Sequence, residues 1–211
     1  MNIIIFIVLM TVTCWLRLCL YHFKFAGSFS LSKRNKIKKM LISEVNALGF
    51  EEFIKIFGNV VEMCPLVAAA VWSNLPFQDL ESLQNSIETF VDQLPLAGKA
   101  GILRCHPDLA GRLAAADQLT DESKLEQKAA GLDDLTPSEK FQMDSLNTRY
   151  KDKFGFPFVI CARENKKDAI LKGLAQRLNN DKDQEIHTGV AEVKKICWLR
   201  LTSIVSTKSS L

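Results

Sequence analysis

Apolar residues recur at steps of three and four along most of the chain from Ser43 onward, which is the spacing of one face of an α-helix. The clearest stripes lie at Phe53–Val61, Val67–Leu75, Leu80–Leu94, Ile170–Leu178 and Ile186–Leu201. No segment alternates apolar and polar residues in the way a half-buried β-strand does. The pattern therefore predicts an all-α, single-domain bundle of about eight helices over residues 43–205.

Capping and breaking residues predict where several helices begin and end. Pro65 suits the first position of a helix, and Thr120 is a good N-cap. The segment Thr136–Glu139 has the pattern of a capping box with proline at the first turn. The helix that follows is expected to stop at Gly155, and Asn165 is the expected N-cap of the next one.

Two short stretches, Cys105–Gly111 and Phe154–Arg163, break the helical pattern. Pro107 fixes one backbone dihedral and moves His106 out of the helical region. An imidazole that titrates near neutrality suits proton transfer, although a single histidine in a helical protein is more often structural. The second stretch predicts an extended segment at 156–162 whose backbone amides can face a buried ligand.

Ser123, Glu126 and Gln127 are spaced so that all three project from one face of a helix. A hydroxyl, a carboxylate and an amide on one face can together bind a ring that carries several amide-like groups. The alternative is a solvated polar face, with Leu125 and Ala129 on the buried side.

Arg200 lies beside the apolar stripe of the last helix, between Cys197 and Leu201. One interpretation is that its charged end reaches outward to water. The other is that its planar guanidinium points into a pocket, where it suits an anionic or carbonyl-rich ligand.

Charge and motifs exclude several classes of function. The formal net charge of +3 comes with no basic face, so nucleic-acid binding is not expected. The motifs HExxH, GxSxG, GxGxxG and the P-loop are absent, which leaves metal hydrolase, serine hydrolase and nucleotide-binding functions without support. The six cysteines show no CxxC pair and are interpreted as free thiols of a reducing compartment. Disulfides are the alternative if the N-terminus directs secretion.

The N-terminus is apolar over residues 3–16, and the positive charges follow this run, beginning at Arg17. That order is wrong for a cleaved secretory signal but suits a weak signal anchor. Residues 1–42 are interpreted as an apolar extension and basic linker outside the fold, with membrane contact expected only if residues 3–20 form a real anchor. Residues 206–211 are interpreted as a C-terminal tail.

Several motifs in one order closely resemble the 2-oxo-4-hydroxy-4-carboxy-5-ureidoimidazoline (OHCU) decarboxylases of uric-acid degradation. They are Val45-Asn46, Phe57–Glu62, His106–Gly111, Ser123–Gln127, Phe154–Arg163 and Trp198–Leu201. The resemblance covers residues 43–203. It implies an all-helical fold, a homodimer, no cofactor and no metal, and the conversion of OHCU into (S)-allantoin with loss of CO2.

The resemblance also implies roles for particular residues. His106 and Glu126 match catalytic positions. The positions implied to contact substrate are Pro107, Ser123, Lys124, Leu125, Glu126, Gln127, Phe158, Val159, Ile160, Cys161, Ala162 and Arg200. Two alternatives stay open: a non-enzymatic helical interaction module tethered by its apolar N-terminus, and an enzyme acting on a related ureido ring compound.

The last residues, Ser209-Ser210-Leu211, differ from the peroxisomal address Ser-Lys-Leu by a serine at the basic position. Enzymes of this pathway are often peroxisomal, so the peroxisome is the expected location and the cytosol is the alternative.

Overall fold

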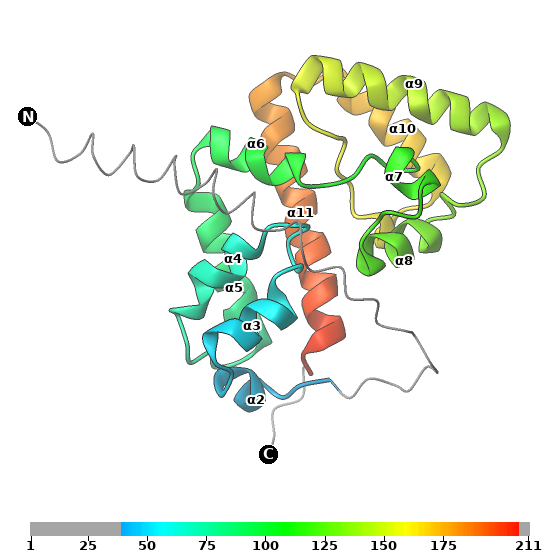
Figure 1. Cartoon of the computed structure of the whole chain (residues 1–211). Coiled ribbons are helices and arrows are strands. Elements are labelled where there is room, and N and C mark those ends of the chain that lie inside the picture. Colours follow the sequence, from blue (N-terminus) through cyan, green and yellow to red (C-terminus); the bar gives the residue numbers. More distant parts are fainter. Residues whose placement is uncertain (1–38, 207–211) are drawn as a thin grey trace, which may run out of the picture. The chain divides into compact units, whose positions relative to one another are not determined.

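The computed structural model describes residues 39–206, which form ten α-helices and one 3-10 helix (Figure 1). The predicted all-α class is confirmed. Within the described range the sole β-type pairing is an isolated bridge between Met40 and Val205. The apolar N-terminal segment, the linker up to residue 38 and the terminal Ser209–Leu211 lie outside the described residues.

The helices follow one another with short connections. Their bounds are α2 Ile42–Asn46, α3 Phe50–Phe57, α4 Pro65–Trp72, α5 Leu80–Gln93, α6 Leu96–Arg104, α7 Arg112–Ala115, α8 Asp121–Ala129, α9 Pro137–Phe154, η2 Ala162–Glu164, α10 Lys167–Arg177 and α11 Lys182–Ile204. None of the helices described here is long and apolar enough to cross a membrane.

Helix α11 is the central element of the domain. It is 23 residues long and packs against α5 and α6. In Figure 1 it runs through the middle of the view in orange to red, with α4 and α5 on one side and α8 on the other. Its predicted apolar stripe is buried as expected, at Ile186, Val190, Val193, Cys197 and Leu201. Arg200 lies in the same buried stretch, so the residue is carried into the interior by the helix that organises the core.

Most predicted helix boundaries are confirmed. Pro65 is the first residue of α4, and the Thr136 side chain and Glu139 form a reciprocal capping box at the start of α9. Gly155 ends α9 with φ of 79°, a left-handed conformation that glycine adopts without steric cost. Asn165 was predicted to cap α10 and does not. Its side-chain amide donates instead to the Cys161 carbonyl at 2.9 Å, and α10 starts two residues later.

The predicted extended segment runs from Pro157 to Cys161, and Ala162 already begins the 3-10 turn η2. Phe158, Val159 and Cys161 are buried. The segment has no strand beside it in the described chain, so its backbone groups depend on side chains and turns for hydrogen bonds.

Candidate functional site

His106 directly follows the end of α6, where Cys105 is the C-cap. Its Nδ1 lies 3.1 Å from the Ile102 carbonyl oxygen. Because a carbonyl only accepts, Nδ1 carries the hydrogen in the neutral ring and Nε2 holds a free lone pair. Nε2 is buried and has no hydrogen-bond partner among the described residues. Burial lowers the pKa of His106 to about 4, although the nearby Glu62 carboxylate opposes the shift, so the ring is neutral at pH 7.

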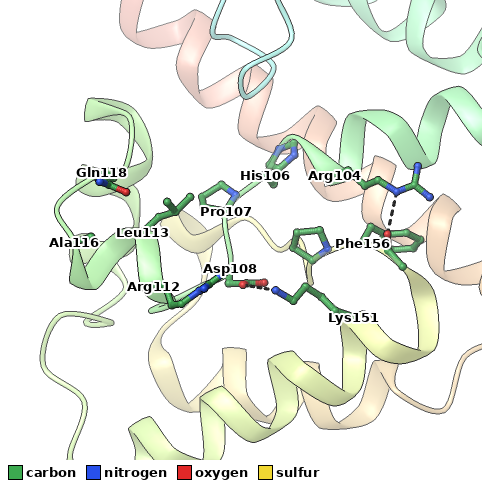
Figure 2. Close-up of a pocket in the computed structure, with 12 residues that line it drawn as sticks. Arg104, His106, Pro107, Asp108, Arg112, Leu113, Ala116, Gln118, Lys151 and Phe156 are labelled. Atoms are coloured by element: carbon green, nitrogen blue, oxygen red, sulfur yellow. Dashed lines mark hydrogen bonds and ion pairs between the residues drawn. The ribbon is translucent and has the colours of Figure 1, made fainter. Parts of the chain in front are cut away.

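The loop after His106 is held by contacts along its length. The Gln127 side-chain oxygen accepts a hydrogen bond from the Ala110 amide at 2.8 Å. Asp108 forms an ion pair with Lys151 at 2.7 Å, which Figure 2 shows beside Pro107. A Cβ on Gly111 would lie 2.6 Å from the Asp108 Cβ, so this close turn requires glycine. The imidazole is therefore presented by a rigid loop.

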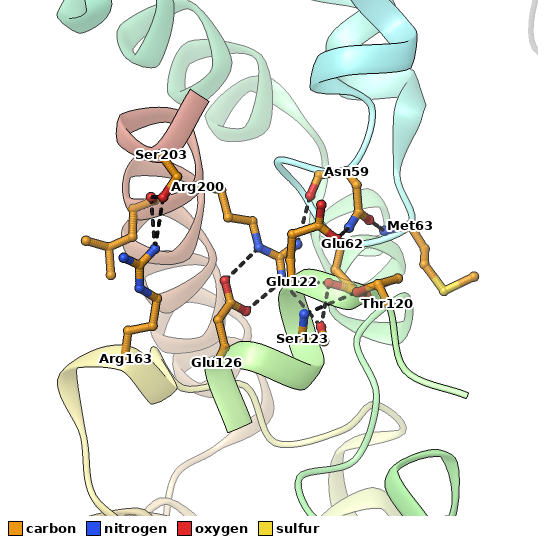
Figure 3. A network of polar contacts seen from close by, with 11 residues as sticks. Asn59, Glu62, Met63, Thr120, Glu122, Ser123, Glu126, Arg163, Arg200 and Ser203 are labelled. Atoms are coloured by element: carbon orange, nitrogen blue, oxygen red, sulfur yellow. Dashed lines mark hydrogen bonds and ion pairs between the residues drawn. The ribbon is translucent and has the colours of Figure 1, made fainter. Parts of the chain in front are cut away.

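Arg200 is the centre of a buried charged network (Figure 3). Its Nε and Nη2 donate to the two oxygens of Glu126 at 2.9 and 2.7 Å, a bidentate pair. Nη2 also lies 2.7 Å from Glu62, and Nη1 donates to the Asn59 carbonyl at 2.8 Å. Burial alone lowers the pKa of Arg200, but the hydrogen bonds with Glu126 outweigh it, so the pKa lies above its usual value. The guanidinium points inward, as the second sequence interpretation held.

Glu62 is a site residue that the sequence reasoning missed. Its side chain is 1% exposed, and it accepts hydrogen bonds from the hydroxyls of Ser123 at 2.7 Å and Thr120 at 2.8 Å. It belongs to the Phe57–Glu62 motif that carries part of the family resemblance. The available signal was an acidic residue directly after two buried valines, a place where a charge needs a partner.

Helix α8 turns its polar face inward. Ser123 and Gln127 are buried, and the Glu126 side chain is 12% exposed. The three predicted residues therefore share one face and lie beside Arg200. The polar face is buried because the guanidinium supplies the charge and hydrogen bonds that compensate for the loss of water.

The alternative for α8, with Leu125 and Ala129 on the buried side, is wrong. Leu125 is 68% exposed, and Ala129 is also exposed. Lys124 points to solvent as well and pairs with Asp117. The side chains of Lys124 and Leu125, both implied as substrate contacts, do not line the cavity.

The extended segment forms one wall of the site. Phe158, Val159, Ile160 and Ala162 line the same cavity as His106 and Arg200. Cys161 does not line it, and its amide donates to the Glu192 carboxylate at 2.8 Å. The amides of Phe158, Val159 and Ile160 find no acceptor in the part of the chain described here.

The cavity is small, about 30 Å³, and is lined by His106, Pro107, Leu109, Ser123, Glu126, Gln127, Phe158, Val159, Ile160, Ala162, Ile196 and Arg200. That volume holds about one water molecule. A second hollow of about 720 Å³ shares His106 and Pro107 with it and adds the basic residues Arg104, Arg112 and Lys151 (Figure 2). A ring compound therefore reaches the cluster by extending from the larger hollow or by displacing side chains. No group of three or more potential metal ligands occurs within residues 39–206.

A neutral imidazole, the Glu126 carboxylate and a guanidinium thus line one cavity inside an all-helical domain, and Glu62 pairs with the same guanidinium. This arrangement of polar groups suits proton transfer on a small charged ligand. The family model for OHCU decarboxylase matches residues 46–202. The chain belongs to the OHCU decarboxylase family.

Named relatives cover the same region. The 2-oxo-4-hydroxy-4-carboxy-5-ureidoimidazoline decarboxylase of Amia calva is 54% identical over 166 residues, 79% of this chain and 95% of that protein. The protein of the same name from Xenopus laevis is 50% identical, over 78% of this chain and 94% of its own length.

Two solved structures share the fold. A crystal structure of (S)-allantoin synthase has a TM-score of 0.63 and 24% identity; the match covers 79% of this chain and about half, 54%, of that one. A crystal structure of OHCU decarboxylase in the presence of (S)-allantoin has a TM-score of 0.58 and 21% identity, over 75% of this chain and 99% of that one.

Proposed function

We propose that this protein converts OHCU into (S)-allantoin and CO2 without a cofactor, the last step from urate to allantoin. The observation that carries the proposal is the buried, unpartnered Nε2 of His106, a residue that lines the same cavity as Glu126 and Arg200. Relatives that share about half of their residues with this chain bear the name of that decarboxylase. In a non-enzymatic interaction module these three side chains have no reason to converge.

The substrate carries its own electron sink. The carbon that bears the carboxylate is bonded to the carbon of a C=N bond, so the electron pair released with CO2 flows into that bond and the nitrogen takes a proton. The product of this step is an enol. Loss of its hydroxyl proton forms the carbonyl of allantoin, and a proton added to the neighbouring ring carbon sets the stereochemistry.

His106 suits the second part of this reaction. Its neutral Nε2 accepts the hydroxyl proton and then donates a proton to the ring carbon from one side. An anionic substrate beside the ring favours the protonated imidazole and assists the first transfer. Glu126, held by two hydrogen bonds to Arg200, lines the same cavity as His106 and orients the polar groups of the substrate.

The remaining groups bind and orient. Arg200 supplies positive charge for the carboxylate and the developing negative charge, together with the free amides of Phe158 and Ile160. Ser123 and Gln127 lie where they can contact the ring and ureido amides. The apolar wall keeps the departing carboxylate away from water, which strengthens each of these electrostatic contacts.

The test uses the chirality of the product, because OHCU also decays spontaneously to racemic allantoin. The variant His106→Asn should fold and yield racemic product, whereas wild type yields (S)-allantoin by circular dichroism. His187→Asn, at an exposed position on α11, is the matched control and should behave as wild type. Optically active allantoin from His106→Asn excludes His106 from the mechanism, and racemic allantoin from the wild type refutes the function.

We also propose that the protein is a homodimer, in keeping with the resemblance. Phe141 is 78% exposed and Leu125 is 68% exposed, so the described domain presents large apolar side chains on its surface. Light scattering of the purified full chain gives the mass directly, and a monomer at micromolar concentration contradicts this part of the proposal.

For location we propose the peroxisome, on the similarity of the C-terminal Ser-Ser-Leu to a peroxisomal address. A fluorescent protein fused to the N-terminus leaves these residues free and should mark peroxisomes. Uniform cytosolic fluorescence favours the alternative.

A further inference from the structure

The backbone of the wall segment Pro157–Cys161 is hydrogen-bonded to side chains, which brace it in place of a neighbouring strand. The Nη1 of Arg177, on α10, donates to the Val159 carbonyl at 2.8 Å. The carboxylate of Glu192, on α11, accepts from the Cys161 amide at 2.8 Å. These two contacts give buried backbone groups of alternate residues the partners that a sheet would otherwise provide.

Arg177 is itself held by a buried carboxylate. Its Nε donates to Glu185 at 2.8 Å, and the two side chains form an ion pair. Glu185 is fully buried and also accepts hydrogen bonds from the Tyr150 hydroxyl and, at 2.6 Å, from the Asn180 amide. The guanidinium lies over the Phe158 ring, 4.5 Å from its centroid. Arg177 therefore contacts both the backbone and a side chain of the wall.

The contacts of Arg177 and Glu192 indicate which of the three unpaired amides face the cavity. In an extended chain the backbone groups of successive residues point to opposite sides. The Val159 carbonyl and the Cys161 amide bind Arg177 on α10 and Glu192 on α11. By this alternation the amides of Phe158 and Ile160 lie on the opposite side, whereas the unpaired Val159 amide lies on the side of its own carbonyl. Both residues line the cavity, and neither amide has an acceptor among the described residues.

We propose that Arg177, held in place by Glu185, is a positioning residue of the active site that sets the distance and direction of the Phe158 and Ile160 amides. This inference rests on the proposed function. Arg177 does not line the cavity and acts through the wall segment. A shift of this segment misplaces two donors together, and displacements of about 1 Å cost on the order of 100-fold in rate when orientation matters.

The geometry requires arginine rather than any cation. A planar guanidinium donates to Glu185 and to the Val159 carbonyl from different nitrogens while its face covers Phe158. A lysine at this position keeps the charge beside Glu185 but has a single nitrogen and no flat face. Arg177→Lys thus keeps a positive charge beside Glu185 but cannot hold Glu185, the Val159 carbonyl and the Phe158 ring at the same time.

Tyr150→Phe is the matched control. It removes one hydrogen bond to the same carboxylate and keeps the aromatic ring that contacts Phe158 at 5.4 Å between centroids. It leaves the contact between Arg177 and Val159 in place. A purely structural role of the network predicts similar effects of the two substitutions, whereas a positioning role predicts different ones.

The experiment compares wild type, Arg177→Lys and Tyr150→Phe, each well below its own melting temperature. We measure kcat, KM and the enantiomeric excess of allantoin, together with hydrogen–deuterium exchange of the peptide that contains residues 157–161. Arg177→Lys should lower kcat/KM by about tenfold or more, reduce the enantiomeric excess and speed exchange in this peptide. Tyr150→Phe should keep kcat/KM within about twofold and exchange at the wild-type rate.

Any other pattern overturns the proposal. Faster exchange with unchanged catalysis shows that the wall need not be held, and lost catalysis with unchanged exchange shows that Arg177 does not hold it. If kcat/KM falls equally in both variants, in proportion to the fall in melting temperature, the network has a structural role alone. If Arg177→Lys does not fold, the double variant Arg177→Gln, Glu185→Gln removes both charges and is judged by the same criteria. A wild type without stereoselective activity refutes the proposed function. Hydrogen–deuterium exchange of residues 157–161 then still tests whether Arg177 holds this segment.

Discussion

Acidification to pH 5.5 should leave catalysis almost unchanged, which is unusual for an enzyme that depends on a histidine. His106 is buried, and its Nδ1 hydrogen is bonded to the Ile102 carbonyl, so the free enzyme presents an unprotonated Nε2. Burial lowers the pKa of this imidazole to about 4, whereas an exposed histidine titrates near 6.5. The base form thus persists through the mildly acidic range.

The expected change in kcat/KM at pH 5.5 distinguishes a buried His106 from an exposed histidine. With a pKa of about 4, about 97% of His106 is neutral at pH 5.5. With a pKa of about 6.5, only about 9% is neutral at that pH. Because kcat/KM reports on the ionisation of the free enzyme, it should stay near its plateau at pH 5.5 rather than fall about tenfold.

The assay is the initial rate of (S)-allantoin formation by circular dichroism, at low OHCU concentration, from pH 4 to pH 8. The spontaneous decay is measured without enzyme at each pH and subtracted. His187→Asn removes the exposed histidine of α11 and should give the wild-type profile. The reasoning is refuted if kcat/KM falls with a midpoint near pH 6.5, or if it rises as the pH drops through 6.5, because the active form is then not a buried neutral base.

Two predictions concern stability. Because the folded state binds a proton to His106 less readily than the unfolded state does, the free energy of unfolding should fall as the pH drops from 6.5 to 4. His106 contributes about 3 kcal/mol to this fall. In urea unfolding, the free energy of unfolding of His106→Asn should therefore fall by about 3 kcal/mol less than that of the wild type over the same pH range. Arg200→Met leaves Glu62 and Glu126 buried without their cation and should cost about 3–5 kcal/mol by chemical unfolding. The matched change Arg163→Met, at an exposed arginine that bonds to the same α11, should stay within about 0.5 kcal/mol. A loss below about 1 kcal/mol for Arg200→Met contradicts the importance of the buried network.

Local features of the sequence predicted most of the longer helices, but no separate stripe or cap was assigned to α2, α6 or α7, and the apolar stripe Phe53–Val61 runs past the end of α3 at Phe57. The capping box at Thr136, the proline at position 65 and the glycine at position 155 act through hydrogen bonds and backbone dihedrals within a few residues. Asn165 shows the limit of this reasoning. A cap requires the side-chain oxygen of Asn165 to accept from backbone amides, but its side-chain NH2 group instead donates to the Cys161 carbonyl, part of a segment whose path depends on the rest of the fold.

The candidate site was predicted in part. His106, Ser123, Glu126 and Arg200 were recognised from motifs, and the structure brings them together. Glu62 was not chosen, because its partners are Arg200 and Ser123, both distant in the sequence. The orientation of α8 was also open, since a mixed helix buries its polar face only when another element offers compensating charge.

The sequence by itself determined the all-helical class, most of the longer helices, where the chain breaks at His106-Pro107 and to which family the motifs are similar. Only the tertiary structure decided that Arg200 meets Glu126 across 74 residues, that α8 faces inward, and that Arg177 braces the wall of the site. Periodicity and capping are short-range properties that each segment carries alone. Buried charges and unpaired amides are stable only where distant elements supply their partners, and that depends on how the whole chain packs.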